Sequence, residues 1–280
     1  MRWVRARRLR PYVAVFAARF LLMLQYRTAA YAGFATQCWW GLIKVMVLAA
    51  FYGGVSAVVP PMSLPQVVTY TWLAQGLLAL MPWLSDPEVV LAVRSGSVAC
   101  DLLRPVNAYA WWYARTAGWI AARVAPRLLL MAAFAAALLP LLGFDRWSWQ
   151  APAGWLAAVC FASSVLLALA LSTSLVMLLN IGMTAALNER GVNAVAAPVV
   201  IVLSGNLLPL PLLPDAWQSV LWLQPLAGLV DIPARLYFGR LQGLEALAGL
   251  GLQAGWTVLA CAAGYQALAA TLRRLEVQGG

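Results

Sequence analysis

The sequence predicts an all-α integral membrane protein with six transmembrane helices. Hydrophobic residues make up 64% of the 280 residues and charged residues only 10%, with a mean hydropathy of +0.81. This composition leaves too little polar surface for a soluble globular protein. Long apolar runs recur along the chain, each near the roughly 20 residues that a helix needs to cross a hydrocarbon core of about 30 Å.

The predicted spans are apolar runs separated by polar or charged turns. They lie within residues 29–59, 64–84, 120–142, 152–179, 192–213 and 244–272. The first contains one charge, at Lys44, and the third is crowded at its start by Arg123 and Arg127. Long arginine side chains at a span end extend toward the lipid headgroups. An even number of spans places both termini on one side of the membrane.

The arginines indicate which side that is, because cytoplasmic segments near span ends retain Lys and Arg. With both termini cytoplasmic, only Arg146, Arg235 and Arg240 among the arginines face outward. The formal net charge of +10 is therefore spread along span ends and does not form one soluble basic face. We expect membrane lipids, and not nucleic acid, to be the partner of these charges.

Residues 1–27 mix arginines with aromatic and aliphatic side chains. Such a segment is typical of a helix that lies in the membrane interface with its charges toward lipid phosphates. A basic lead-in to the first span is the alternative. With the six spans that follow, the sequence predicts a single domain over residues 1–280.

Missing residues exclude several kinds of chemistry. The chain has no histidine, which rules out a Ser-His-Asp triad and removes the commonest nitrogen ligand of metal sites. Its four cysteines lie far apart without CxxC spacing, so we expect neither a metal site nor a catalytic residue. No GxxxxGK[ST] motif is present, so ATP-driven work would require an ATPase on another polypeptide. A cytoplasmic loop would have to contact that ATPase.

Residues 85–118 are the sizeable cytoplasmic segment that could make this contact. Glu88 lies in the first turn of a predicted helix, where a negative charge is favourable. Gly96 breaks that helix, and Asp101 and Arg104 lie three residues apart on one helical face. The pattern predicts a short helical loop in two parts that docks an ATPase. A solvated amphipathic connector is the alternative.

Residues 207–240 are expected to form a re-entrant outer segment between the fifth and sixth spans. Prolines such as Pro209 and Pro214 break a spanning helix and free backbone carbonyls, which lipid does not tolerate. Trp217 is suited to a membrane interface. A long proline-rich outer loop with anchoring tryptophans is the alternative.

Two further charged positions have open interpretations. Lys44 could contact an anionic headgroup, but pairing with a neighbouring subunit or with a backbone carbonyl is favoured. The acidic residues map to loops or span ends, which argues against ion-coupled transport. Glu189 and Arg190, between the fourth and fifth spans, could form a second ATPase contact or a solvated ion pair.

Two patterns carry a resemblance to a known family. The first is Arg94-Ser95-Gly96-Ser97 followed by Leu102-Leu103-Arg104-Pro105. The second is Ser204-Gly205-Asn206, then Pro209, Pro211, Pro214, Gln224-Pro225, Ile232-Pro233 and Tyr237-Phe238-Gly239. In this order they resemble the first cytoplasmic loop and the outer segment of bacterial type-2 ATP-binding-cassette (ABC) permeases, and the resemblance covers nearly the whole chain. Leu226 departs from the aromatic residue that family members often carry at this position.

The resemblance implies two groups of site residues. Those of the ATPase-coupling loop are Glu88, Arg94, Gly96, Asp101, Arg104 and Pro105. Those of the outer segment are Gly205, Asn206, Pro209, Pro214, Trp217, Pro225 and Pro233.

The resemblance further implies a multi-pass permease subunit in the bacterial cytoplasmic (inner) membrane. It would belong to an ATP-driven exporter that moves a hydrophobic or amphipathic cargo, such as a lipid, drug or peptide, outward. ATP and Mg²⁺ would be bound by a separate ATPase in two copies, and this chain would hold no cofactor. A second permease, identical or different, would complete the pathway. An integral-membrane enzyme or a scaffold acting on lipid-linked substrates is the alternative, although no catalytic cluster appears.

Overall fold

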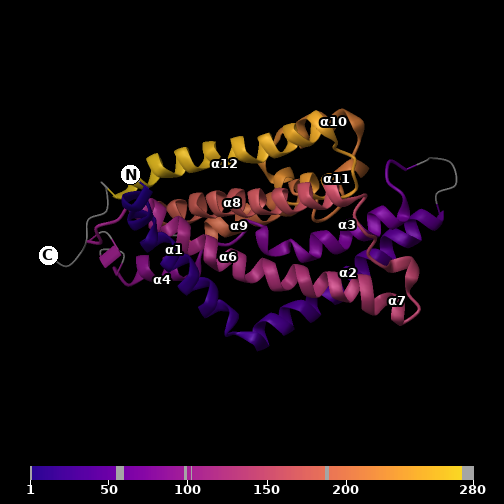
Figure 1. Cartoon of the computed structure of the whole chain (residues 1–280), viewed down its shortest axis with the longest axis horizontal. Coiled ribbons are helices and arrows are strands. Elements are labelled where there is room, and N and C mark those ends of the chain that lie inside the picture. The colour runs from indigo at the N-terminus through magenta and orange to yellow at the C-terminus, as the bar shows by residue number, and fades with distance from the viewer. Residues whose placement is uncertain (1, 55–59, 98–99, 102, 187–188, 273–280) are drawn as a thin grey trace.

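The computed structural model describes residues 2–54, 60–97, 100–101, 103–186 and 189–272. Within these ranges every regular element is a helix, as the composition predicts (Figure 1). The α-helices are α1 (Arg2–Leu24), α2 (Arg27–Gly54), α3 (Leu64–Gly76), α4 (Pro87–Arg94), α6 (Ala108–Ala133), α7 (Leu139–Leu141), α8 (Trp155–Ala186), α9 (Glu189–Leu203), α10 (Asp215–Leu223), α11 (Asp231–Tyr237) and α12 (Gly243–Leu272). The short elements are η1 (Leu78–Leu80), η2 (Phe134–Leu138), η3 (Asp145–Trp147), η4 (Leu210–Leu212) and η5 (Pro225–Leu229).

In the described part of the chain, four helices are long and apolar enough to cross a membrane. They are Ala30–Gly54, Ala108–Leu141, Trp155–Thr184 and Gly243–Thr271. They overlap the ranges of the first, third, fourth and sixth predicted spans. The second of these helices joins α6 to α7 through η2, a wider π-helical turn.

That helix begins before the predicted third span, so the connection that precedes it ends at residue 107. Asn107 caps the helix, because its side-chain Oδ1 accepts a hydrogen bond from the backbone N–H of Ala110 at 2.9 Å. Residues 108–118, which include Arg115, form its first turns.

The other two predicted spans contain shorter helices. α3 has 13 residues and α9 has 15, or about 20 and 22 Å at the usual rise per residue, so neither alone matches a core of about 30 Å. The apolar run of α3 continues into η1 and then becomes extended before Pro82. α9 ends before Gly205, whose φ of +81° is left-handed. Six complete spans therefore remain a prediction.

The helices pack into one bundle whose central elements are α6 and α8. α12 packs along α8, α1 packs along the first half of α6, and α3 lies between α2 and α6. Large side chains are fully buried between these helices, among them Trp72, Tyr70, Leu171 and Trp112. Between helices that lie in lipid, van der Waals packing of such side chains is a main stabilising contribution.

The bundle has two distinct ends. Figure 1 shows the start of α1, the end of α12 and α4 at one end, which we call the α4 end. α7, α10 and the start of α12 lie at the opposite end, which we call the α10 end. The predicted N-terminal helix is present as α1, and it meets α2 at an elbow formed by Gln25 and Tyr26.

Candidate functional site

The loop of residues 85–107, at the α4 end, connects the region of η1 to α6. Its helix α4 ends where the backbone N–H of Ser95 donates to the carbonyl of Leu91 at 2.9 Å. Gly96 follows with a φ of +72°, a left-handed conformation that favours glycine. A Cβ atom there would meet no atom within 4 Å. The turn conformation, and not crowding, therefore requires glycine at this position.

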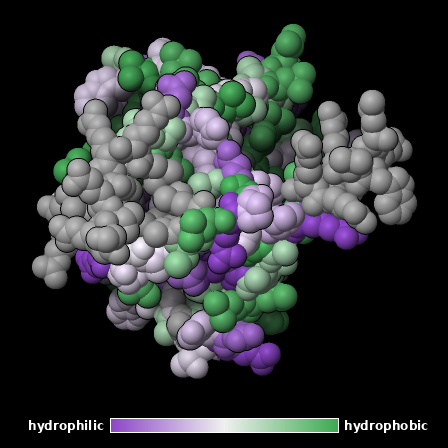
Figure 2. Space-filling view, turned by 90° about the vertical axis from the view of Figure 1, so that its left-hand side faces the viewer, coloured by the Kyte–Doolittle hydropathy of each residue, from purple (hydrophilic) through white to green (hydrophobic). Residues whose placement is uncertain are grey.

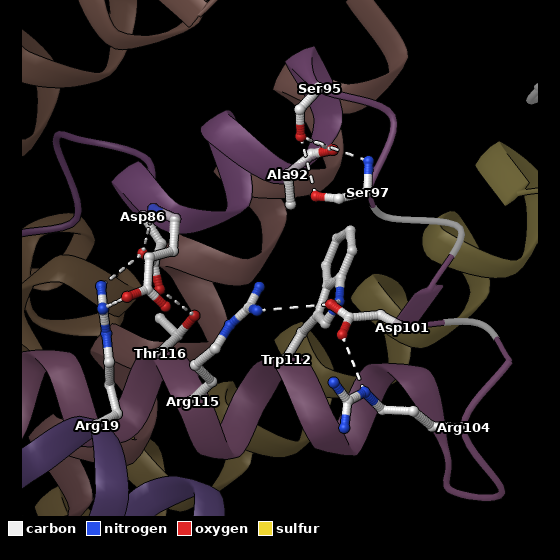
Figure 3. A network of polar contacts seen from close by, with 11 residues as sticks. Arg19, Asp86, Ala92, Ser95, Ser97, Asp101, Arg104, Trp112, Arg115 and Thr116 are labelled. Carbon is white, nitrogen blue, oxygen red and sulfur yellow. Dashed lines mark hydrogen bonds and ion pairs between the residues drawn. The ribbon is translucent and has the colours of Figure 1, made fainter. Parts of the chain in front are cut away.

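Asp86 anchors the start of this loop to three helices, and its side chain is fully buried (Figure 3). Its Oδ1 lies 3.4 Å from Nη2 of Arg19 on α1, and its Oδ2 accepts from Oγ1 of Thr116 on α6 at 3.2 Å. Its backbone N–H donates to Oδ1 of Asn180 on α8 at 2.8 Å. Burial raises the pKa of Asp86, while the charge of Arg19 opposes that shift.

Neighbouring contacts extend the anchoring to α9 and again to α1. Oδ1 of Asn193 on α9 accepts from the backbone N–H and the hydroxyl of Ser85, at 3.2 and 3.3 Å. Arg19 forms a second ion pair with Glu88 on α4. At the far end of the loop, the backbone N–H of Asn107 donates to the hydroxyl of Tyr12 on α1 at 3.1 Å. The loop is therefore held to α1 at both of its ends.

Asp101 is a second anchor, nearer the end of the loop (Figure 3). Its carboxylate lies 3.3 Å from Nε of Arg104 and 3.5 Å from Nη1 of Arg115 on α6. It also accepts a hydrogen bond from the indole Nε1 of Trp112 at 3.2 Å. The guanidinium of Arg104 lies over the ring of Trp111, 4.9 Å from its centroid. Asp101 and Arg104 are thus in contact, as their spacing predicts.

The loop has a buried face and an exposed face. Val89 and Val90 are buried in a cluster with residues of α6 and α8. On the opposite face Leu91 is 66% exposed and Leu103 is 85% exposed. The predicted loop residues on the exposed side are Arg94, Gly96, Arg104 and Pro105, with Glu88 partly exposed. Figure 2 shows this end, where hydrophilic and hydrophobic residues alternate over the surface.

Lys44 and Asn206 connect α2 to the segment after α9. The ammonium of Lys44 donates to the backbone carbonyl of Asn206 at 2.8 Å and contacts its side-chain Oδ1 at 3.3 Å. Lys44 thus pairs with a backbone carbonyl, as favoured from the sequence. The side-chain amide of Asn206 donates to the carbonyl of Ala74 at 3.1 Å. A Cβ atom at Gly205 would lie 2.3 Å from the hydroxyl of Tyr70, so this approach requires glycine.

The predicted outer-segment residues differ in burial. Pro209 and Pro233 are buried and Pro225 is half-buried, whereas Pro214 and Trp217 are exposed. The residues from η5 through α11 are nearly all buried, and they pack against α8 and α12. This part of the segment therefore lies inside the bundle and is not a loop around it.

A family model described as ABC-2 family transporter protein matches residues 39–279 of the chain. The chain belongs to the ABC-2 transporter family. Proteins of this family are the membrane components of ABC transporters, so the chain is a multi-pass permease subunit that works with an ABC ATPase. No curated protein and no solved structure matches the chain significantly.

Not every predicted site residue of this ABC-2 permease can be placed. The backbone of Glu189 and Arg190 begins α9, but their side chains lie outside the described residues. The predicted second ATPase contact therefore stays a prediction. The same holds for the cytoplasmic position of the C-terminus, because residues 273–280 lie outside the described ranges.

The structure also reveals residues of the permease that sequence reasoning missed. Besides Asp86 and Arg19, these include Asp231, which is fully buried on α11. Its Oδ2 lies 2.6 Å from Nε of Arg235, and its Oδ1 accepts from the hydroxyl of Tyr70 at 3.4 Å. The spacing of Asp231 and Arg235, four residues apart in a helix, was a signal available in the sequence. Asp86 offered no such local signal, because its partners are distant in sequence.

Proposed function

We propose that this ABC-2 permease receives its ATP-driven movement through the loop of residues 85–107. The exposed face of the loop, with Leu91, Leu103 and Arg104, is the contact surface for the ATPase. The buried anchors Asp86 and Asp101 pass the displacement of the loop to the helices. The observation that carries this proposal is the set of contacts of Asp86, which joins α1, α6 and α8 at one buried carboxylate and its backbone.

In this proposal the protein lies in the inner membrane of a bacterium, with the α4 end and both termini in the cytoplasm. The distribution of charged residues supports this orientation. Exposed arginines such as Arg10, Arg94 and Arg104 lie toward the α4 end, whereas Arg146 precedes α8 at the opposite end. ATP and Mg²⁺ are bound by the ATPase, present in two copies, and a second permease, identical or different, completes the complex.

The cargo in this proposal is hydrophobic or amphipathic, such as a lipid, drug or peptide, and it is exported. A cavity of about 420 Å³ between α8 and α12, at the α10 end, supports an apolar cargo. Its lining is mostly apolar, with Leu156, Leu247 and Leu250 among the side chains. The buried position of η5 and α11 supports a re-entrant outer segment over residues 207–240.

Association with the ATPase is tested by replacing the exposed leucines of the loop. We expect Leu91→Ser with Leu103→Ser to reduce the ATPase that co-purifies with the tagged protein from its native host by about tenfold, because apolar contacts at an interface centre dominate affinity. The ATPase is identified by mass spectrometry through its P-loop and quantified against the permease.

The matched control is Leu141→Ser with Leu244→Ser, at the α10 end, where the two side chains are 82% and 84% exposed. This control should retain the ATPase of the unmodified chain. Equal recovery of the ATPase with both double variants would contradict the proposed contact surface, as would the absence of any P-loop protein from the unmodified complex.

A further inference from the structure

A cavity of about 180 Å³ lies between the α1–α2 elbow and α6. Met23 and Tyr26 line it from the elbow, and Trp119, Arg123, Pro126 and Arg127 line it from α6. The guanidinium of Arg123 lies over the ring of Trp119, 4.5 Å from its centroid. The cavity thus combines two cations with aromatic and aliphatic walls.

The two arginines of this cavity form no ion pair within the described residues, although the charge of the buried Asp86, which pairs with Arg19, acts on Arg123. The ion pairs found there involve Arg19, Arg104, Arg115 and Arg235, and neither Arg123 nor Arg127 forms one or donates a hydrogen bond. They lie four residues apart on one helix face, where like charges repel. Both side chains are half-buried. Such a pair is unfavourable unless an anion occupies the space between and beside them.

Arg127 also reaches toward α2. A Cβ atom at Gly33 would lie 3.2 Å from Nη2 of Arg127, so the guanidinium packs closely against α2 at this glycine. The cavity is therefore bordered by α2 as well as by α6. An anion held there would contact groups positioned by both helices.

The length of the spanning helix places this cavity at the headgroup level. The continuous helix Ala108–Leu141 has 34 residues, or about 51 Å, whereas a hydrocarbon core of about 30 Å needs about 20 residues. A span that ends near Leu141, whose side chain is exposed, begins near Ala122. Arg123 and Arg127 then lie in its first two turns, from which long arginine side chains extend to the phosphate groups of the lipids.

We infer that Arg123 and Arg127 bind the phosphate headgroup of an anionic phospholipid in this cavity. Arginine suits this role, because its guanidinium donates several hydrogen bonds to phosphate oxygens. The acyl chains extend beside α2 and α6 toward the apolar part of the span. This site is distinct from the ATPase contact surface, and its occupancy does not depend on the coupling role of the loop.

The inference is tested by native mass spectrometry of the full chain, released from detergent after titration with phosphatidylglycerol. We expect Arg123→Gln with Arg127→Gln to lower the retained phosphatidylglycerol by about tenfold, because each basic side chain near a membrane surface contributes to anionic-lipid binding. Arg94→Gln with Arg146→Gln removes the same charge from exposed positions outside the cavity and outside α1, and should bind as the unmodified chain does.

A charge-preserving variant, Arg123→Lys with Arg127→Lys, keeps the test valid if the glutamine variant does not fold. It should retain most of the binding, and the single variant Arg127→Gln should lose part of it. Two further probes distinguish the sources of phosphate: zwitterionic phosphatidylcholine and inorganic phosphate should both bind more weakly than phosphatidylglycerol.

Equal retention of phosphatidylglycerol by the unmodified chain and the glutamine variant would overturn the inference. An equal loss in the Arg94 and Arg146 control would do the same, because binding would then depend on net charge alone. Binding of inorganic phosphate as strong as that of phosphatidylglycerol would overturn the assignment to a lipid.

Discussion

At the scale of single residues, the carboxylate that anchors the start of the loop belongs to a buried ion pair. Asp86 is fully buried, and the side chain of its partner Arg19 is 8% exposed. Removing one member of such a pair leaves the other charge uncompensated in a low-dielectric environment, which costs more than the pair itself contributes. The anchors of the loop should therefore be sensitive to substitution even though they lie far from any cargo.

Asp86→Asn is expected to reduce the stability of the permease by about 2 kcal/mol, because Arg19 keeps only Glu88 as an ion-pair partner. The measurement is the midpoint of thermal unfolding of the purified protein in detergent. Asp145→Asn, at an exposed position, is the control and should leave the midpoint unchanged. Identical midpoints for the two variants would contradict a structural role for the Asp86 cluster.

At the scale of elements, the contact of α1 with α6 joins the N-terminal helix to the bundle. Gly118 lies at the closest approach, where an added Cβ atom would be 2.6 Å from the backbone carbonyl oxygen of Phe16. Because that neighbour is backbone, it cannot move without displacing α1. This contact positions Arg19 and Tyr12 for their bonds to the loop.

Gly118→Ala should therefore separate α1 from α6 and destabilise the protein by about 1–3 kcal/mol, the usual cost of inserting a methyl group into a packed contact. Gly255→Ala on α12 is a matched control, since no atom lies within 4 Å of the added Cβ. Alanine there should be neutral or slightly stabilising, because alanine favours helices more than glycine does. The rate of protease cleavage near Arg10 measures the separation of α1 from α6, and the midpoint of thermal unfolding measures the change in stability. Unchanged cleavage and midpoint in Gly118→Ala would show that α1 is not held at this contact.

The elements themselves were only partly predictable from hydropathy. The apolar runs correctly identify four long helices. They do not show where α3 and α9 end, because the residues that follow each helix are also apolar although their backbone is extended or forms a turn. α3 ends at Gly76, and α9 ends shortly before Gly205, which has a left-handed φ. A hydropathy profile does not detect such a backbone conformation. The predicted third span begins at residue 120, whereas α6 begins at Ala108 after the cap at Asn107, because hydropathy marks the apolar part of a helix and not its polar first turns.

At the scale of the whole molecule, the bundle has an exposed loop at the α4 end and a largely buried outer segment at the α10 end. α6, α8 and α12 connect the two ends. The composition predicted the membrane class and the order of motifs predicted the family, which the match over residues 39–279 confirms. The buried clusters around Asp86 and Asp231 could not be predicted, because they join residues that only the fold brings together.

The central claim is that buried anchors pass movement from the loop to the helices, and a distance measurement across the α10 end tests it most directly. Spin labels on Leu141→Cys and Leu244→Cys, in a chain whose four native cysteines are replaced, report on the ends of α7 and α12. In the complex with its ATPase, ATP should change this distance. With Asp86→Asn and Asp101→Asn together, the ATPase should still co-purify but the ATP-dependent change should be lost. An undiminished change in that variant would contradict the account.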